Sequence, residues 1–270
     1  MSPVDFQVGR HRTAGRQSKL RIAMSTMHDS RAQGPKIDCA FCGVLGRTEW
    51  SGLAAAAMSR FNGAKVCRRF DRGEVIFYEG DSCRGIYCIK NGLVGIRKID
   101  GEGNSVLLGR LGYPGTTLGY RPLLAGECHR GTAEALEDSQ VCFIAAGLVR
   151  WLLANDPNLG LRFLRHAAKD LGNAEEDFFH HAAHPLRLRL AHLLLVLKEH
   201  YGESNGDGTV LIELPVRRQD LASMMGARPE SLSRVIKEMD RDGLATFSGR
   251  HVRIRSIEDL LWELEPEGEA

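Results

Sequence analysis

The chain has 270 residues, of which 36 are basic and 34 acidic, so its formal net charge is only +2. This length allows one large domain or two smaller ones around an ordinary buried core. The composition excludes a fibrous chain, and no window reaches the roughly 18 apolar residues that a membrane span needs. Seven cysteines, an odd number, argue against a secreted disulfide framework. We therefore expect a soluble, cytoplasmic protein without a membrane partner.

Residues 1–35 carry six basic side chains against two acidic ones and show no apolar period. This composition predicts a disordered basic arm. A secretory signal would need a continuous apolar run behind its charges, and the arm has none. Two alternatives stay open for the arm, an organelle transit peptide and a true start at Met24 or Met27.

Between about Val66 and Ile144 the sequence consists of short β-type runs separated by glycine-containing turns. The runs recur roughly every ten residues, which is typical of a compact antiparallel barrel or sandwich. We therefore assign residues 36–150 to one sensory β-barrel domain, which begins with the cysteine pair of the stretch KIDCAFCG. The clearest runs are Val75–Tyr78, Ile86–Ile89, Leu93–Arg97 and Val106–Gly109.

Residues 151–183 are predicted to contain one long helix. Asp156-Pro157 is a suitable helix start, and a narrow apolar stripe with three- and four-residue spacing follows it. So narrow a stripe favours an a/d seam against a second copy of the chain, and packing on the chain's own barrel is the alternative. Glu175 lies on the stripe, where its charge would repel its counterpart across a dimer. The apolar members are Leu161, Leu164, Ala168, Leu171 and Phe178.

The remaining residues predict a winged helix-turn-helix domain at 184–258 and an acidic tail at 259–270. Ala222 suits a close helix crossing and Gly226 a sharp turn, as in a helix-turn-helix unit. His184-Pro185 should end the long helix. The expected elements are helices at Leu186–His200, Arg218–Met225 and Pro229–Asp242, a polar loop at Gly202–Thr209, and a hairpin over residues 245–254.

Glu230, Ser233 and Arg234 share one face near the start of the second short helix, which is the part of such a helix that enters a major groove. Arginine can donate two hydrogen bonds to guanine, and a carboxylate can accept from a base amino group. The alternative is an exposed ion pair between Glu230 and Arg234. Basic side chains around this face are expected to contact DNA phosphates, namely Arg217, Arg218, Arg228, Lys237 and Arg250.

The order of barrel, long helix and helix-turn-helix, with the stretches EGDSCRGIYCIKNGLV and PESLSRVIKEM, resembles the Crp/Fnr family of bacterial transcription regulators. The resemblance implies an α+β fold. Its parts would be a cyclic-nucleotide-binding-like antiparallel β-barrel (a double-stranded β-helix), a long dimerisation helix and a C-terminal winged helix-turn-helix. It also implies a homodimer on double-stranded DNA, with RNA polymerase as a partner. The Glu-x-x-Ser-Arg pattern is similar to the Fnr branch, which implies that Glu230, Ser233 and Arg234 contact a TTGA-type half-site.

Crp-like members bind cyclic nucleotide through a Gly-Glu-Leu segment and an Arg-Ser pair. Here Gly119 is followed by Tyr120 and Arg121, and Arg130 is followed by Gly131. Two polar groups that would offset the burial of a cyclic nucleotide are therefore missing. The sequence argues against cAMP as the ligand.

Fnr-like members instead hold a [4Fe-4S] cluster through cysteines near the N-terminus and one in the last barrel strand. Cys39 and Cys42 supply a C-x2-C pair, and Cys142 matches the barrel cysteine of the family. The third N-terminal cysteine is absent, so the resemblance implies another ligand, for which we choose Cys67. The other candidates are Cys83, Cys88 and Cys128.

Three alternatives to an iron–sulfur cluster stay open, namely thiol redox sensing, haem or another ligand, and no cofactor. Imidazoles for haem would come from His129, His180, His181 and His184. We expect no enzyme, because no nucleophile, base and orienting group stand in a recognisable pattern. A nucleotide-gated signalling module without DNA binding is the other alternative.

Overall fold

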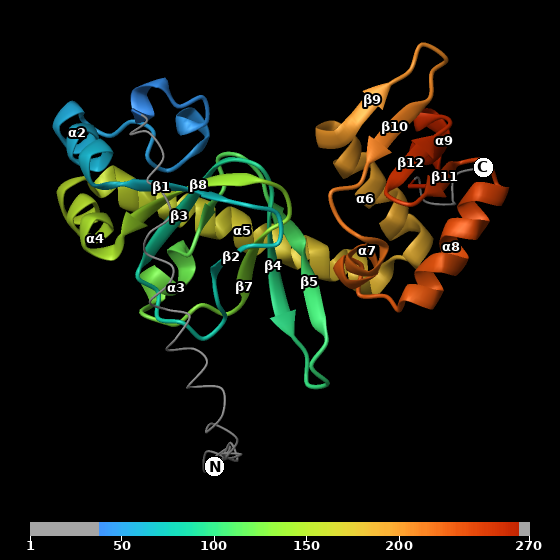
Figure 1. The fold of residues 1–270 in the computed structure, drawn as a ribbon, viewed down its shortest axis with the longest axis horizontal. Coiled ribbons are helices and arrows are strands. Elements are labelled where there is room, and N and C mark those ends of the chain that lie inside the picture. Colours follow the sequence, from blue (N-terminus) through green and yellow to red (C-terminus); the bar gives the residue numbers. More distant parts are fainter. Residues whose placement is uncertain (1–37, 265–270) are drawn as a thin grey trace. The chain divides into compact units, whose positions relative to one another are not determined.

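The computed structural model describes residues 38–264, so the predicted basic arm and residues 265–270 of the predicted tail lie outside the described residues. Two four-stranded antiparallel sheets form the barrel, with strand orders β1-β8-β3-β6 and β2-β7-β4-β5 (Figure 1). Ile89 and Val141 of the first sheet pack with Phe77, Val94 and Ala133 of the second. The predicted β-barrel is therefore confirmed, with its core between the two sheets.

The barrel strands follow the predicted runs closely. Gly92 turns the chain between β3 and β4 with φ of 84°, where a side chain would be strained, and a Cβ there would lie 2.2 Å from the hydroxyl of Ser139. The strands are β1 Val66–Phe70, β2 Val75–Phe77, β3 Gly85–Asn91, β4 Val94–Ile99, β5 Ser105–Gly112, β6 Thr117–Leu118, β7 Thr132–Ala135 and β8 Ser139–Ala145.

Short helices that the sequence pattern did not predict surround the barrel. The described chain opens with two 3₁₀ turns, with Cys39 in the first and Cys42 directly after it, and continues into α2. The predicted boundary at residue 151 lies inside α4, which is apolar on the face that packs on the barrel through Val149 and Leu152. These elements are η1 Cys39–Phe41, η2 Leu45–Arg47, α2 Ala55–Ala64, α3 Tyr120–Ala125 and α4 Ala146–Asn155.

The long helix α5 spans Pro157–Ala183 and begins where the sequence predicts. The Asp156 carboxylate accepts from the backbone N–H groups of Asn158 and Leu159, and Pro157 occupies the first turn, where no N–H is needed. Leu159 and Phe163 bury one face of α5 against the barrel helices.

The predicted a/d stripe of α5 lies on a different, solvent-facing side of the helix. Leu164 is 64% exposed, Leu171 61% and Phe178 74%. The alternative that this stripe packs on the chain's own barrel is therefore wrong, since another face of α5 makes that contact. The stripe is left exposed along the part of the helix that the described residues contain.

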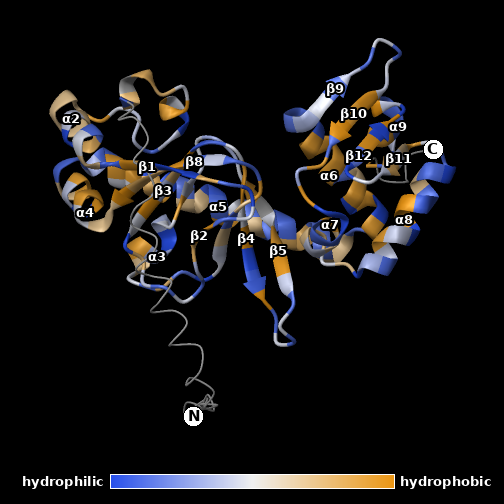
Figure 2. Ribbon diagram, viewed as in Figure 1, coloured by the Kyte–Doolittle hydropathy of each residue, from blue (hydrophilic) through white to orange (hydrophobic). Residues whose placement is uncertain are grey.

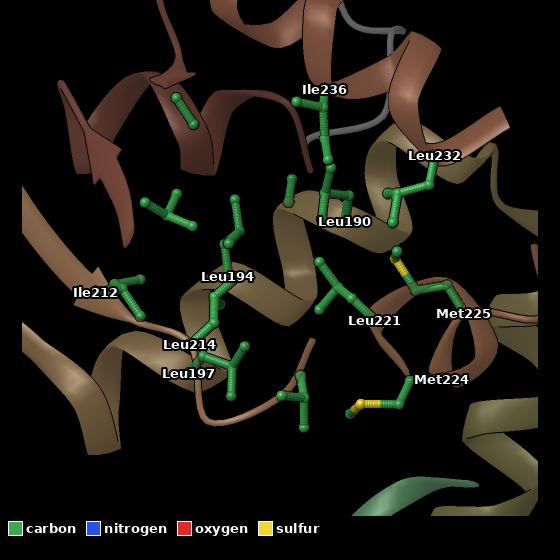
Figure 3. Close-up of a cluster of buried hydrophobic side chains, with 14 of the residues drawn as sticks. Leu190, Leu194, Leu197, Ile212, Leu214, Leu221, Met224, Met225, Leu232 and Ile236 are labelled. Atoms are coloured by element: carbon green, nitrogen blue, oxygen red, sulfur yellow. The ribbon is translucent and has the colours of Figure 1, made fainter. Parts of the chain in front are cut away.

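The C-terminal unit has the predicted winged helix-turn-helix architecture. Leucines from α6 pack with side chains from β10, α7 and α8 (Figure 3). Its four-stranded sheet has the order β11-β12-β10-β9. The elements are α6 Leu186–Tyr201, β9 Gly202–Ser204, β10 Val210–Glu213, α7 Arg218–Met224, α8 Pro229–Arg241, β11 Ala245–Ser248, β12 His251–Ile254 and α9 Ile257–Trp262.

Two parts of this unit differ from the sequence prediction. The expected loop at Gly202–Thr209 contains β9, a fully exposed strand that pairs with the hydrophobic strand β10 (Figure 2). The expected tail contains α9, which begins at a Ser256 cap on the N–H of Asp259 and buries Leu260. Both were missed because β9 has no apolar side and α9 is only a few residues long. Within residues 38–264 no helix has the length and apolar character of a membrane span.

Candidate DNA-contact surface and cysteine region

The start of α8 presents the three residues that were predicted to contact bases. Pro229 occupies the first turn, and Arg228 precedes it as an N-cap residue whose side chain makes no capping hydrogen bond. Glu230 and Arg234 are exposed and Ser233 is half-buried. Because Glu230 and Arg234 form no ion pair in the part of the chain that the structure describes, the alternative of a simple surface ion pair is not realised.

The predicted phosphate-contact residues fall into two groups. Arg217, Arg218, Arg228 and Lys237 are exposed, and within residues 38–264 none of them is engaged in an ion pair. Arg250 already has intramolecular partners: its Nε donates to the carbonyl of Leu214 at 2.8 Å, and its terminal nitrogen lies 3.9 Å from the Glu213 carboxylate. Arg250 therefore holds the wing against β10 as well as adding charge to the surface.

Five cysteines converge on one sheet of the barrel and its cover. Cys67, Cys142 and Cys88 are direct cross-strand neighbours on β1, β8 and β3, so their side chains share one face. Cys67 and Cys142 are joined as a disulfide across a sequence separation of 75. Cys39 and Cys88 belong to the same buried hydrophobic cluster. Cys39 and Cys42 also lie close enough to Cys88 to raise its pKa.

Burial dominates the acidity of these thiols. Burial, with smaller contributions from nearby Glu49, Cys42 and Cys39, raises the pKa of Cys88 to about 12. Burial also raises the pKa of Cys39, although Lys65 opposes the shift. Both side chains are therefore held as neutral thiols near pH 7, which makes them slow nucleophiles.

The predicted ligand set of Cys39, Cys42, Cys67 and Cys142 is not assembled in this structure. The disulfide occupies the sulfurs of Cys67 and Cys142, and residues 38–264 contain no group of three or more Cys, His, Asp or Glu side chains placed to hold a metal ion. The residues as they stand therefore do not fit a [4Fe-4S] cluster. Of the other candidates, Cys88 lies in this region, whereas Cys83 donates to the carbonyls of Gly85 and Gly119 elsewhere.

A buried polar network joins α5 to residues 39–49, the segment that contains Cys39 and Cys42. Glu49 follows η2, and its carboxylate accepts from the Thr117 hydroxyl at 2.6 Å and pairs with Nδ1 of His166. The other ring nitrogen of His166 faces Asp170. Arg162 donates from Nε to the backbone carbonyl of Glu49 at 2.6 Å. Two residues of α5 therefore hold the backbone and the side chain of Glu49.

The charges of this network are mutually stabilising. Hydrogen bonds to Asp170 and Glu49 raise the pKa of His166 to about 9. Burial works to raise the pKa of Glu49, but hydrogen bonds from His166 and Thr117 outweigh it and lower that pKa. At neutral pH the imidazolium and the carboxylate are therefore both charged.

Aromatic rings fill part of the barrel interior. The rings of Phe77 and His129 stack at 3.8 Å between centroids, and Tyr87 packs 5.1 Å from Phe77. Arg130 is outside this stack and pairs with Glu127 on the surface. His129 is thus a buried core residue and not a free haem ligand.

One ion pair connects the barrel to the helix-turn-helix. Arg97 on β4 donates from Nε to Glu134 of β7 at 2.5 Å and from its terminal nitrogen to Asp220 of α7 at 2.6 Å. All three side chains are less than a quarter exposed, so solvent screens the pair weakly. Met224 and Leu107 belong to one hydrophobic cluster across the same contact.

Neither Glu49 nor His166 was predicted from the sequence to be part of a site. A usable signal was a second stripe on α5, since Leu159, Phe163, His166 and Asp170 also recur at three- and four-residue spacing. Two apolar members followed by a histidine and an aspartate indicate a helix face that ends in a buried polar contact. The partner Glu49, far away in sequence, carries no such local signal.

These features define a class of protein, namely DNA-binding regulators in which a β-barrel is joined by a long helix to a winged helix-turn-helix. Residues 67–156 match the family model for the cyclic nucleotide-binding domain, and residues 188–261 match that for the Crp-like helix-turn-helix domain. The chain belongs to the Crp/Fnr family of transcription regulators.

Relatives and a solved structure agree with this family. The chain is 24% identical over 189 residues to the regulatory protein HlyX of Actinobacillus pleuropneumoniae, which covers 70% of this chain and 78% of that protein. It is 24% identical over 193 residues to the fumarate nitrate reduction regulatory protein of Klebsiella oxytoca, covering 72% and 76%. The structure of TTHA1359, a Crp/Fnr-family regulator from Thermus thermophilus, aligns with a TM-score of 0.63 and 27% identity over 75% of this chain and 100% of that chain.

Proposed function

We propose that the chain is a cytoplasmic, homodimeric transcription regulator of the Fnr-like branch that binds a TTGA-type palindrome and responds to redox state through its barrel cysteines. It acts by binding and not by catalysis, with RNA polymerase as its partner on DNA. The observation that carries the DNA-binding part is the face of exposed Glu230 and Arg234 with half-buried Ser233, where no ion pair from residues 38–264 competes with base contacts.

The exposed stripe on α5 supports the dimer. Apolar side chains at a/d spacing on a solvent-facing helix are the usual seam of a two-stranded coiled coil, and such large exposed groups are otherwise costly. A two-fold seam would place two copies of α8 about one DNA turn apart, which matches a palindromic site.

The Cys67–Cys142 disulfide favours a thiol signal. Reduction would add two electrons and two protons, break the sulfur–sulfur bond and leave two thiols. Hydrogen peroxide would reverse this step: it takes two electrons and two protons from the thiols, the sulfur–sulfur bond forms, and two water molecules are released. A change of redox state at Cys142 of β8 would alter the neighbouring residues 39–49, and the ion pair of Glu49 with His166 would transmit this change to α5.

An iron–sulfur cluster is the second candidate, favoured by the Fnr-like relatives. The cluster would require reduction of the Cys67–Cys142 disulfide and a rearrangement of the cysteines, which are not grouped to hold a metal ion within residues 38–264. Such a cluster would supply oxygen sensitivity.

Purification without oxygen, followed by iron and sulfide assays and a visible spectrum, separates the two chemistries. Thiol sensing predicts a colourless, iron-free protein whose DNA affinity changes on oxidation and whose response needs both Cys67 and Cys142. Stoichiometric iron and sulfide, with a response that survives Cys67→Ser, would favour the cluster. No binding to a TTGA palindrome in either state would refute the proposed function.

A further inference from the structure

A cavity lies where the end of α5, helix α6, helix α7 and strand β5 meet, and none of its lining residues is a cysteine. Its volume of about 390 Å³ is within the range of small-molecule sites. One part of its lining is apolar, and the contributing side chains are Leu107, Leu108, Leu188, Leu193, Met224 and Met225.

The other part of the lining is unusually basic. It contains His180 and His181 from α5, His184 directly after α5, and Arg189 and His192 from α6. The ring of His180 lies 5.0 Å from that of His184 and 5.2 Å from that of His192, measured between centroids. Asp177 is the acidic residue of this lining, and its backbone carbonyl is already engaged with Nδ1 of His181.

Arg189 provides a second, independent observation. Its terminal nitrogen donates to the carbonyl of Met225 at 2.6 Å, which fixes the guanidinium at the cavity wall. Its Nε is buried and has no hydrogen-bond acceptor among the described residues. A buried N–H of a charged group without an acceptor is expensive, so this position favours an anionic oxygen.

A metal ion suits these residues less well than an anion. In residues 38–264 no group of three or more ligating side chains is arranged around a common point, and the fixed guanidinium would repel a cation. Loss of solvent, together with His180 and His184, lowers the pKa of His192, so this imidazole is mostly neutral near pH 7 and would meet an anion through its N–H.

We propose that this cavity binds a small organic anion with an apolar body, whose carboxylate meets Arg189 and the imidazoles while its body packs on the leucine and methionine side chains. A ligand held there would touch α5, α6, α7 and β5 at once. It would therefore couple the end of the long helix to the helix-turn-helix, and this coupling is separate from the cysteine signal proposed above.

The test uses the full chain and the probe 4-phenylbutanoate, with 4-phenylbutylamine as a cation that has the same apolar body. Isothermal titration should give a dissociation constant below about 1 mM for the carboxylate and at least about tenfold weaker binding for the amine. The Arg189→Gln variant should weaken carboxylate binding at least about tenfold. Lys198→Gln, on the same helix but outside the cavity lining, is the matched control and should bind normally.

Leu193→Trp provides a second variant that fills the cavity without removing charge, and it should also abolish binding. Circular dichroism melting checks that each variant is folded. Absence of carboxylate binding by the unaltered protein, equal binding of the amine, or unchanged binding by both folded variants would overturn the proposal. So would tight binding of Zn²⁺ that the carboxylate cannot displace. Loss of DNA binding with this titration intact would refute only the proposed function.

Discussion

Replacing His166 by Gln should weaken the structure in a way that depends on pH. The ion pair of His166 with Glu49, flanked by Asp170, joins the cysteine segment to α5. Hydrogen bonds to Asp170 and Glu49 raise the pKa of His166 from 6.5 to about 9. One pKa unit corresponds to about 1.4 kcal/mol, so the full shift corresponds to about 3.4 kcal/mol. Because 22% of the side chain is exposed, we reduce the expected contribution to about 2 kcal/mol.

The direction of the pH effect follows from the sign of each shift. A raised histidine pKa means that its stabilisation is complete below pH 6.5 and is lost as the pH rises through about 9. The lowered pKa of Glu49 means that its contribution is present above pH 4.5 and is lost in more acidic solution. The unaltered protein should therefore lose about 2 kcal/mol of unfolding free energy between pH 6.5 and 10 through this pair.

Urea unfolding followed by tryptophan fluorescence measures this change, since Trp50 is buried next to Glu49. His166→Gln should be less stable than the unaltered protein by about 2 kcal/mol at pH 6.5 and about equally stable at pH 10. His251→Gln, which alters an exposed imidazole on β12, is the matched control and should change stability little at either pH. A constant difference between His166→Gln and the unaltered protein at all pH values would refute the assigned ion pair.

Four further substitutions test the DNA contact, the dimer seam and the contact between β4 and α7. Arg234→Ala should weaken binding to a TTGA palindrome by about 1–3 kcal/mol in an anisotropy titration. The control Arg241→Ala should lose less binding free energy. Equal losses in the two variants would contradict base contact by Arg234. Leu164→Glu should convert the dimer to a monomer in sedimentation analysis. Glu175→Ala should tighten the dimer and permit DNA binding without the signal. Unchanged signal dependence of Glu175→Ala would refute the repulsive role of Glu175. Arg97→Gln should speed hydrogen exchange in α7 by loosening its contact with β4, and an unchanged rate would show that the ion pair does not hold the helix.

Local patterns predicted the architecture well. The bounds of α5 follow from Asp156 and Pro157 at one end and Pro185 at the other, because capping and the missing proline N–H act within one turn. The barrel strands follow from short runs of β-type residues separated by glycine-containing turns. The three residues at the start of α8 were predicted from spacing alone, since side chains three and four apart share a helix face.

Contacts between distant residues were predicted less well. The resemblance brought Cys39, Cys42 and Cys142 into one region, but it could not indicate that Cys67 and Cys142 are direct neighbours on adjacent strands. That pairing depends on strand order and register, which a single sequence does not specify. The Glu49–His166 contact was missed for the same reason. The histidines of α5 were recognised as part of a candidate site only because the structure places Arg189 of α6 in the same cavity lining.

The most direct test of the central claim is the affinity of the full chain for a TTGA palindrome, measured by fluorescence anisotropy in the reduced and the peroxide-treated states. The account predicts that the two dissociation constants differ by at least about tenfold, or about 1.4 kcal/mol, and that Cys142→Ser abolishes the difference. The exposed Cys128→Ser should retain it and serves as the control. Equal affinities in the two states, or an undiminished difference in Cys142→Ser, would contradict redox control through the barrel cysteines.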